Sequence, residues 1–487
     1  MKEIAFCSAT ELAKMIRDGK ISSTELVDLY LRRIEQLNPK INAVVTLDRE
    51  GALKQAKAAD KARAKGKSLG PLHGIPITIK DGFETAGLRT TSGAPVFKNH
   101  TPKVHAAAVQ RYVDAGAVIM GKTNVPLFCA DSQSYNDIFG ITNNPWDVSR
   151  SPGGSSGGAA AAVAAGLTGL ELGSDIAGSI RLPASWCGVF GHRPSFGIVP
   201  FRGHIPPPPG IVAEADLAVA GPIARSAADL KLALDLLAGP DPLTATAWQL
   251  ALPKPRANSL KKYRIAAWMS EDGFPVDQTV QRVLKGVISA LRSEGAAVDE
   301  KARPGFNAAD SFRTYQKMLT PIIASGFPSK VLEFLAQVAQ SEGERSDLGI
   351  FATDTHLLHR HWLSANAKRQ AHRHMWADFF KRYDVLLCPV VSVPAIVHDT
   401  RRTQIERTIQ VNGRSEPYGL LLKWAGLFTH VYLPCTSAPV GRTAEGLPVG
   451  IQVVGPYLED LTTIDFAQRL AKVIGGYEPP PGYQGKP

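Results

Sequence analysis

The residues best suited to chemistry in this sequence are serines held in glycine-rich clusters. Ser155 and Ser156 lie in the run GGSSGG over residues 153–158, and Ser179 lies in a second cluster further along the chain. A serine hydroxyl is a weak nucleophile unless a neighbouring base takes its proton. No histidine lies in either cluster, so the usual partner of a nucleophilic serine is missing from these motifs.

A short strand that ends on a lysine, and an alternation of further elements, would position these serines. Residues 74–80 are rich in β-branched side chains and end on Lys80 before an Asp-Gly pair, which predicts a buried strand. The pattern also predicts strands over 117–120 and 168–172 that alternate with helices over 106–115, 158–165 and 180–186. Such alternation predicts an α/β fold whose sheet is covered by helices on both faces.

The composition excludes several classes of protein. With 44% hydrophobic and 20% charged residues over 487 positions, the chain lies in the soluble globular range. Its net charge of +11 comes from basic residues spread along the chain without interleaved aromatic side chains, so we expect no nucleic-acid partner. No apolar stretch reaches the ~20 residues of a membrane-spanning helix, and the five cysteines form no CxxC pair. We therefore expect a cytoplasmic protein that binds no membrane.

Two further motifs suggest other chemistry. Residues 116–123 match GxxxxGK[ST], so a nucleotide-binding protein is one alternative. The residues between these glycines are strand-like, whereas a phosphate loop needs flexible residues followed by a helix. Residues 153–157 match GxSxG, but the stretch before them has the composition of a loop, and a nucleophile elbow requires an apolar strand there.

A histidine-rich stretch could indicate metal binding. Five of the 12 histidines lie in residues 356–374, and His356 and His359 could share one helix face. No cysteine or carboxylate set completes such a site in the sequence, and no HExxH motif is present. The stretch therefore predicts an exposed basic helix, and we expect neither a metal nor an organic cofactor.

Residues 151–195 as a whole resemble the amidase signature, in which GGSSGG is followed by a small-residue helix, GxDxGGSIRxPA and GxxGxKPS. The resemblance implies a single domain over residues 1–487 with one large mixed sheet covered by helices on both faces. Its core would span about residues 60–240 and 431–475, and residues 243–430 would form a variable substrate-pocket region. Similar landmarks lie over residues 72–81, 121–126, 139–147, 221–225 and 446–456.

The resemblance implies a triad of Ser179 as nucleophile, Ser155 as a bridging serine after a cis peptide, and Lys80 as base. An exposed lysine has a pKa near 10.4 and would be protonated at neutral pH. Lys80 must therefore be buried enough to favour its neutral form. Its place at the end of an apolar strand fits that requirement.

The second serine cluster would also supply the oxyanion hole. Small residues at a tight turn let successive backbone N–H groups converge on the oxygen of a tetrahedral intermediate. Most family members have glycine where this chain has Ala177, and the extra methyl group would restrict the loop or reshape the pocket. The matching donors are the N–H groups of Ile176, Ala177, Gly178 and Ser179.

Other residues of the resemblance would support or line the site. Asp175 and Arg181 would brace the turn without touching substrate. Arg193 stands where the family pattern has lysine, and we assign it no catalytic role. Cys129 and Asp131 fall where relatives line the acyl pocket.

The resemblance implies hydrolysis of a carbon–nitrogen acyl bond by an amidase. The aromatic residues of the variable region favour an apolar or aryl amide or a carbamate (urethane), and amide oligomers are also open. A glutaminase-like subunit of a tRNA-dependent amidotransferase is an alternative within the family. Such subunits carry a motif that resembles DxxTxPxNxAGLP near the C-terminal landmark. The corresponding run here, residues 422–434, begins with Leu422 in place of the acid and contains no carboxylate that could bind the amino group of glutamine. The expected partner is a small-molecule amide or carbamate substrate. The sequence does not decide whether the protein forms a homodimer.

Overall fold

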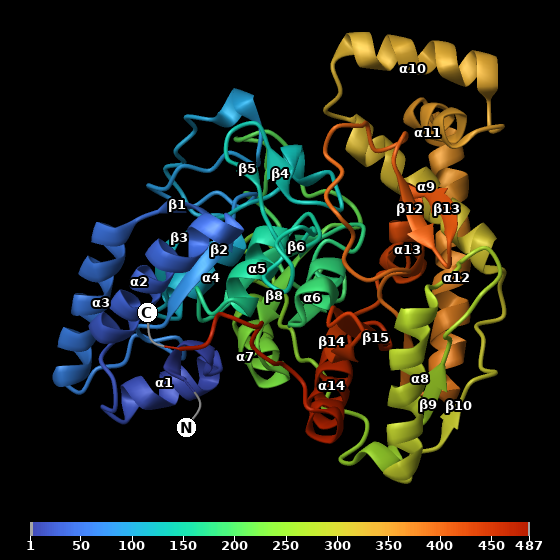
Figure 1. Ribbon diagram of the computed structural model, residues 1–487. Helices are drawn as coiled ribbons and strands as arrows, with labels where there is room; N and C mark the ends of the chain where they lie inside the picture. The colour runs from blue at the N-terminus through green and yellow to red at the C-terminus, as the bar shows by residue number, and fades with distance from the viewer. Residues whose placement is uncertain (1–2, 486–487) are drawn as a thin grey trace.

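The computed structural model describes residues 3–485 and arranges eleven strands in one mixed sheet (Figure 1). Two small hairpins lie outside this sheet: β4 (Tyr135–Asn136) with β5 (Gly140–Ile141), and β12 (Thr408–Val411) with β13 (Arg414–Pro417). In spatial order the sheet contains β1 (Val44–Leu47), β3 (Val118–Thr123), β2 (Pro76–Lys80), β6 (Glu171–Asp175), β8 (Val219–Ala224), β7 (Phe190–Arg193), β14 (Cys435–Arg442), β15 (Pro448–Val454), β11 (Val385–Pro389), β9 (Ile265–Ala267) and β10 (Val298–Asp299).

Helices alternate with strands through much of the chain, and most of them pack on the sheet (Figure 1). Within residues 3–485 they are α1 (Ala9–Arg17), α2 (Ser23–Ile41), α3 (Arg49–Ala64), α4 (Ala107–Asp114), α5 (Gly157–Ala164), α6 (Arg181–Cys187), α7 (Ala227–Leu237), α8 (Gln278–Ser293), α9 (Ala308–Ala324), α10 (Ser329–Glu342), α11 (Asp347–Thr355), α12 (His359–Arg382), α13 (Lys423–Thr429) and α14 (Asp460–Ile474). The four helices α9 to α12 follow one another without a strand between them.

The sheet is covered on both of its faces. Every residue of β2, β3 and β6 is buried. Because successive side chains of a strand point to opposite faces, complete burial requires a cover on each side. Helix α5 consists of glycine, alanine and one valine, all buried, so its backbone packs closely on β2, β6 and β8. The predicted fold, one large mixed sheet with helices on both faces, is confirmed.

The segment that matches a phosphate-loop pattern folds differently. Residues Val118–Thr123 form strand β3, and all six are buried. The amine of Lys122 lies inside the protein, 2.9 Å from the hydroxyl of Thr90 and 3.7 Å from Asp81. No flexible loop is therefore available here to surround a phosphate group.

Residues 243–430 form mostly helices beside one end of the sheet. Helices α10 and α11 project from the body (Figure 1) and pack on each other through a small cluster around Leu335, Val338 and Ala352. The histidine-rich stretch lies mainly on α12, and no group of three metal-ligating side chains occurs within residues 3–485. Over the same residues, no helix has the length and apolar character needed to cross a membrane.

Candidate active site

Lys80 is the centre of a buried cluster of hydroxyl groups. It is the last residue of β2, which runs parallel to β6, so the carboxyl ends of both strands meet at one place. Its side chain is completely buried. Its Nζ atom lies 2.7 Å from Ser155 Oγ, 3.0 Å from Ser156 Oγ and 2.9 Å from Ser174 Oγ. The strand end thus brings the lysine into direct contact with the first serine cluster.

The surroundings of Lys80 favour its neutral form. Burial lowers the pKa of Lys80 from its ordinary value, and the nearby Cys129, Asp175 and Glu171 oppose this shift less strongly. Burial also raises the pKa of Glu171 to about 8, although this carboxyl accepts hydrogen bonds from Thr78 and Thr123. At neutral pH Glu171 is therefore largely protonated and offers little negative charge to hold a lysinium ion.

The two serine clusters meet in space. The Gly154–Ser155 peptide is cis, as the resemblance implied. The N–H of Ser156 donates to the carbonyl oxygen of Ser179 over 3.2 Å, and Ser179 is only 8% exposed. Position 154 has no room for a side chain, because a Cβ at Gly154 would lie 2.5 Å from the carbonyl oxygen of Asp131. Close backbone packing thus holds Ser155 and Ser179 on neighbouring turns.

The turn between Asp175 and Ser179 carries the predicted oxyanion donors. Gly178 has a φ of 102° and donates its N–H to the Asp175 carboxylate over 2.9 Å. Within residues 3–485, the N–H groups of Ile176, Ala177 and Ser179 have no hydrogen-bond acceptor. The four expected donors therefore reduce to three that are free for an incoming oxygen. Ala177 avoids positive φ, so its methyl group causes no backbone strain.

A buried ion pair holds this turn. Arg181 Nη2 lies 2.9 Å from Asp175 Oδ1, and the Nε atom of Arg193 lies 3.8 Å from the same oxygen. Although burial opposes ionisation, the two arginines and the Gly178 N–H keep the pKa of Asp175 well below its ordinary value. Arg193 also donates to the Leu433 carbonyl oxygen over 2.9 Å, so its guanidinium group joins separate segments.

Of the two predicted pocket residues, Cys129 lies near the hydroxyl cluster around Lys80, whereas the carboxylate of Asp131 is occupied by hydrogen bonds to other side chains. A Cβ at Gly82, two residues after Lys80, would lie 3.0 Å from Cys129 Sγ. The carboxylate of Asp131 accepts hydrogen bonds from Tyr135 at 3.0 Å, Tyr418 at 2.7 Å and Arg407 at 2.6 Å. These bonds leave Asp131 little capacity to bind a substrate directly.

Two further residues, Ser174 and His204, complete the surroundings of Lys80, and the sequence motifs did not identify either of them as part of the site. Ser174 directly precedes Asp175 in the signature, and its hydroxyl lies 2.9 Å from His204 Nε2. His204 lies just before four prolines, a context typical of a surface loop. No spacing relation in the sequence connects this histidine to the serine clusters, so only the folded chain shows the contact.

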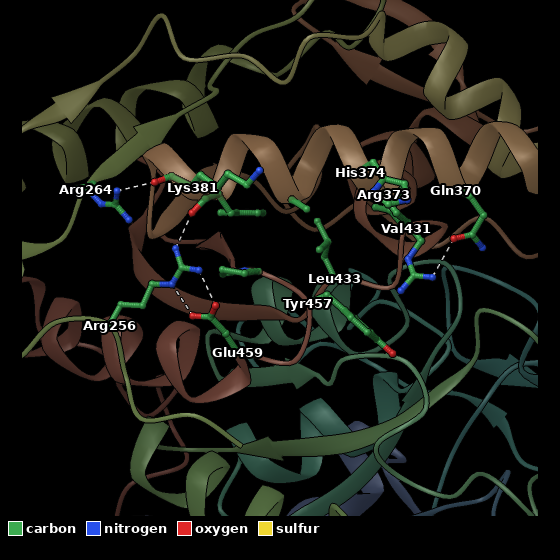
Figure 2. A pocket seen from close by; sticks show the side chains of 13 residues that line it. Arg256, Arg264, Gln370, Arg373, His374, Lys381, Val431, Leu433, Tyr457 and Glu459 are labelled. Atoms are coloured by element: carbon green, nitrogen blue, oxygen red, sulfur yellow. Dashed lines mark hydrogen bonds and ion pairs between the residues drawn. The ribbon is translucent and has the colours of Figure 1, made fainter. Parts of the chain in front are cut away.

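One cavity of about 710 Å³ lies outside this cluster, between α12 and the segments leading into β14 and α14 (Figure 2). Its cations are largely paired: Arg256 makes two hydrogen bonds of 2.5 Å with Glu459, and Arg264 donates to the Lys381 carbonyl oxygen over 2.7 Å. None of the serines described above lines it. This cavity is therefore separate from the serine cluster around Lys80.

Comparison with known proteins identifies the class of this fold and site. The chain resembles a glutamyl-tRNA(Gln) amidotransferase subunit from Synechococcus sp. (strain CC9605), with 34% identity over 96% of this chain and 94% of that protein. Among solved structures, a bacterial aryl acylamidase of the amidase signature family superposes with a TM-score of 0.79, at 25% identity over 96% of each chain. The corresponding amidotransferase subunit from Thermotoga maritima has a TM-score of 0.78, at 25% identity over 99% of each chain. The fold is thus shared with amide-hydrolysing enzymes, and the chain is an enzyme of that class.

The family model described as Amidase matches residues 25–464. The chain belongs to this family, the amidase signature enzymes.

Proposed function

We propose that the protein hydrolyses an amide or carbamate through an acyl-enzyme formed on Ser179. The contact that carries this proposal is the 2.7 Å approach of the Lys80 amine, whose pKa burial lowers, to Ser155 Oγ. Ser179 Oγ attacks the carbonyl carbon, its proton passes to Ser155, and the Ser155 proton passes to Lys80. Lys80 then returns a proton through Ser155 to the leaving nitrogen, and water releases the acid.

The turn after Asp175 supplies the electrostatic part of this mechanism. The free N–H groups of Ile176, Ala177 and Ser179 would donate to the negative oxygen of the tetrahedral intermediate. The buried pair of Asp175 with Arg181 holds these donors in place before substrate arrives. No residue of this scheme requires a metal or an organic cofactor.

The charges around the site favour a substrate without charges of its own near the scissile bond. Asp131 is paired with Arg407, and Asp175 is paired with Arg181, all four side chains being nearly or completely buried. Position 422, where amidotransferase subunits have an acid, is a partly buried leucine. Holding the ammonium and carboxylate groups of glutamine would require unpaired partners of opposite charge. We therefore favour a neutral apolar or aryl amide or a carbamate.

Glutamine hydrolysis within an amidotransferase is the second candidate, and the named relatives favour it. The Synechococcus protein and a Geobacillus kaustophilus protein, the latter 32% identical over 97% of this chain, are both named as glutamyl-tRNA(Gln) amidotransferase subunits. If this chain had that role, it would need further subunits to receive the ammonia. The two candidates share the same serine chemistry and differ in substrate and partners.

A substrate panel separates the candidates. Purified protein would be assayed with chromogenic anilides, aryl carbamates and glutamine, with Ser179→Ala as the matched inactive control. We expect turnover of anilides or carbamates and none of glutamine. Glutaminase activity that exceeds both, or that emerges once the remaining amidotransferase subunits are added, would establish the second candidate. Because the five cysteines are widely spaced and form no CxxC pair, we place this activity in the reducing cytoplasm.

A further inference from the structure

His204 lies beside the hydroxyl cluster in a rigidly held position. Its ring stacks on Phe201 at a centroid distance of 4.5 Å and contacts the edge of Phe83 at 4.8 Å. A Cβ at Gly82 would lie only 2.8 Å from His204 Nε2. The Nδ1 atom lies 3.1 Å from the Pro206 carbonyl oxygen, and Nε2 lies 2.9 Å from Ser174 Oγ. Both ring nitrogens are therefore used.

These two contacts determine which nitrogen carries the proton. Burial lowers the pKa of His204 to about 3, so its imidazole is neutral at physiological pH. A carbonyl oxygen can only accept a hydrogen bond, so Nδ1 holds the proton and donates it to Pro206. Nε2 is then a bare acceptor, and the Ser174 hydroxyl must donate to it.

The direction of that hydrogen bond continues to Lys80. Because Ser174 gives its hydrogen to His204, its oxygen can only accept from the Lys80 amine at 2.9 Å. Ser156 likewise donates to the Ser174 carbonyl oxygen over 3.2 Å and accepts from Lys80 at 3.0 Å. A neutral amine has two N–H groups and one lone pair. Both N–H groups are thus used, and the lone pair is left for Ser155.

We propose that His204 is a positioning residue that acts through Ser174 to turn the lone pair of neutral Lys80 toward Ser155. The inference rests on the proposed function, in which Lys80 receives the Ser155 proton. Without an acceptor at position 204, the Ser174 hydroxyl can rotate and donate to the Lys80 lone pair. It would then compete with Ser155, and proton removal from Ser179 would slow.

The test compares two amide side chains at position 204. In His204→Gln, the longer side chain can place its oxygen near the Nε2 position and accept from Ser174. In His204→Asn, the shorter side chain can reach the Pro206 carbonyl oxygen and falls short of Ser174. The readout is the rate at which a fluorophosphonate probe labels Ser179, followed by mass spectrometry across pH. For His204→Asn we expect a loss of about tenfold in the alkaline plateau rate, the effect of one hydrogen bond, with His204→Gln close to wild type.

The pH profile distinguishes positioning from loosened packing. A Ser174 hydroxyl that donates to Lys80 stabilises the neutral amine, so the midpoint of the alkaline rise should move to lower pH in His204→Asn. Water entering a loosened site would relieve the burial of Lys80 and move that midpoint upward. The charged and titratable groups that face Lys80, namely Glu171, Asp175 and Cys129, are unchanged in either variant.

A double-mutant cycle with Ser174→Ala completes the test. If His204 acts through Ser174, adding His204→Asn to Ser174→Ala should cost less than twofold, since the coupled residue is already gone. A buried histidine outside the cluster, His192, serves as the control through His192→Gln, which should leave labelling unchanged. Additive losses, an upward midpoint shift or wild-type labelling in His204→Asn would overturn the role of His204. Absence of Ser179 labelling in the wild-type protein would instead overturn the proposed function, and the inference with it.

Discussion

The amine of Lys80 and the hydroxyl of Ser155 lie 2.7 Å apart, although 75 positions separate them along the chain. The contact forms because β2 ends beside β6, and Ser156, just before α5, donates to the carbonyl oxygen of Ser174 on β6. A charged lysine and a neutral one make different use of this contact: the former donates to Ser155, and the latter accepts from it. The predictions below depend on which form is present.

Replacing each serine should give losses of different size. Ser179→Ala removes the atom that bonds to the substrate, so turnover should fall to background, a loss of up to about 10⁶-fold. Ser155→Ala removes only a proton carrier, and we expect a loss of about 10²–10⁴-fold. Single-turnover kinetics measure both, with circular dichroism as a check on folding. If Ser155→Ala were the more damaging change, the two roles would have to be exchanged.

Activity should rise with pH. Since burial lowers the pKa of Lys80 from its ordinary value of 10.5, the neutral base is lost as pH falls through this lowered pKa and is fully present above it. The rate of acylation should therefore increase toward a plateau whose midpoint lies below 10.5. Stopped-flow acylation between pH 5 and 10 would show this rise. A flat profile with chemistry rate-limiting would exclude Lys80 as the base.

Breaking the buried ion pair should destabilise the fold. Asp175→Asn leaves the guanidinium of Arg181 buried without its counter-ion, which costs about 3–5 kcal/mol of unfolding free energy. Denaturant titration measures the change. Asp378→Asn removes an exposed partner of Lys381 and should leave the midpoint unchanged. Equal effects of the two variants would show that the Asp175 pair has no special role.

Cys129 should be the first cysteine to react with iodoacetamide. The other four thiols are buried, whereas Cys129 is half-buried and adjoins Gly82. Burial raises the pKa of its thiol, so alkylation should be slow at neutral pH and accelerate under alkaline conditions. Peptide mapping would identify the modified residue, and a bound substrate should slow the reaction. Equal modification with and without substrate would place Cys129 outside the pocket.

The apolar and glycine-rich patterns predict the core elements well, because these elements form by hydrophobic burial and close backbone packing. The predicted strand over residues 74–80 corresponds to β2, and the predicted helix over 158–165 corresponds to α5. The strand predicted over 168–172 lies three residues later, at Glu171–Asp175. That strand is buried with polar side chains that bond to neighbouring groups, and hydrophobicity patterns do not detect such a strand.

The sequence predicts those residues of the candidate site that lie within a recognisable motif, and it does not predict the others. Lys80, Ser155 and Ser179 belong to motifs, and the folded chain brings Lys80 against Ser155 and the backbones of the two serine clusters together. His204 and Arg407 reach the site from loops whose path depends on the whole sheet. Their contacts arise from tertiary packing, and no local spacing encodes them. Gly178 is a different case: Asp175 lies only three residues before it and accepts its N–H, a local side-chain contact that aligning the motif as a row of free donors overlooks.

The pairing of Asp131 with Arg407 has a consequence for engineering. Asp131 lies within residues 60–240 and Arg407 within residues 243–430, and each side chain is less than 5% exposed. A chimaera that replaces residues 243–430 with those of another family member would leave the Asp131 carboxylate buried without a counter-ion, unless the graft brings a matching guanidinium group. Designers who exchange this region to alter selectivity should therefore transplant both halves of the pair together.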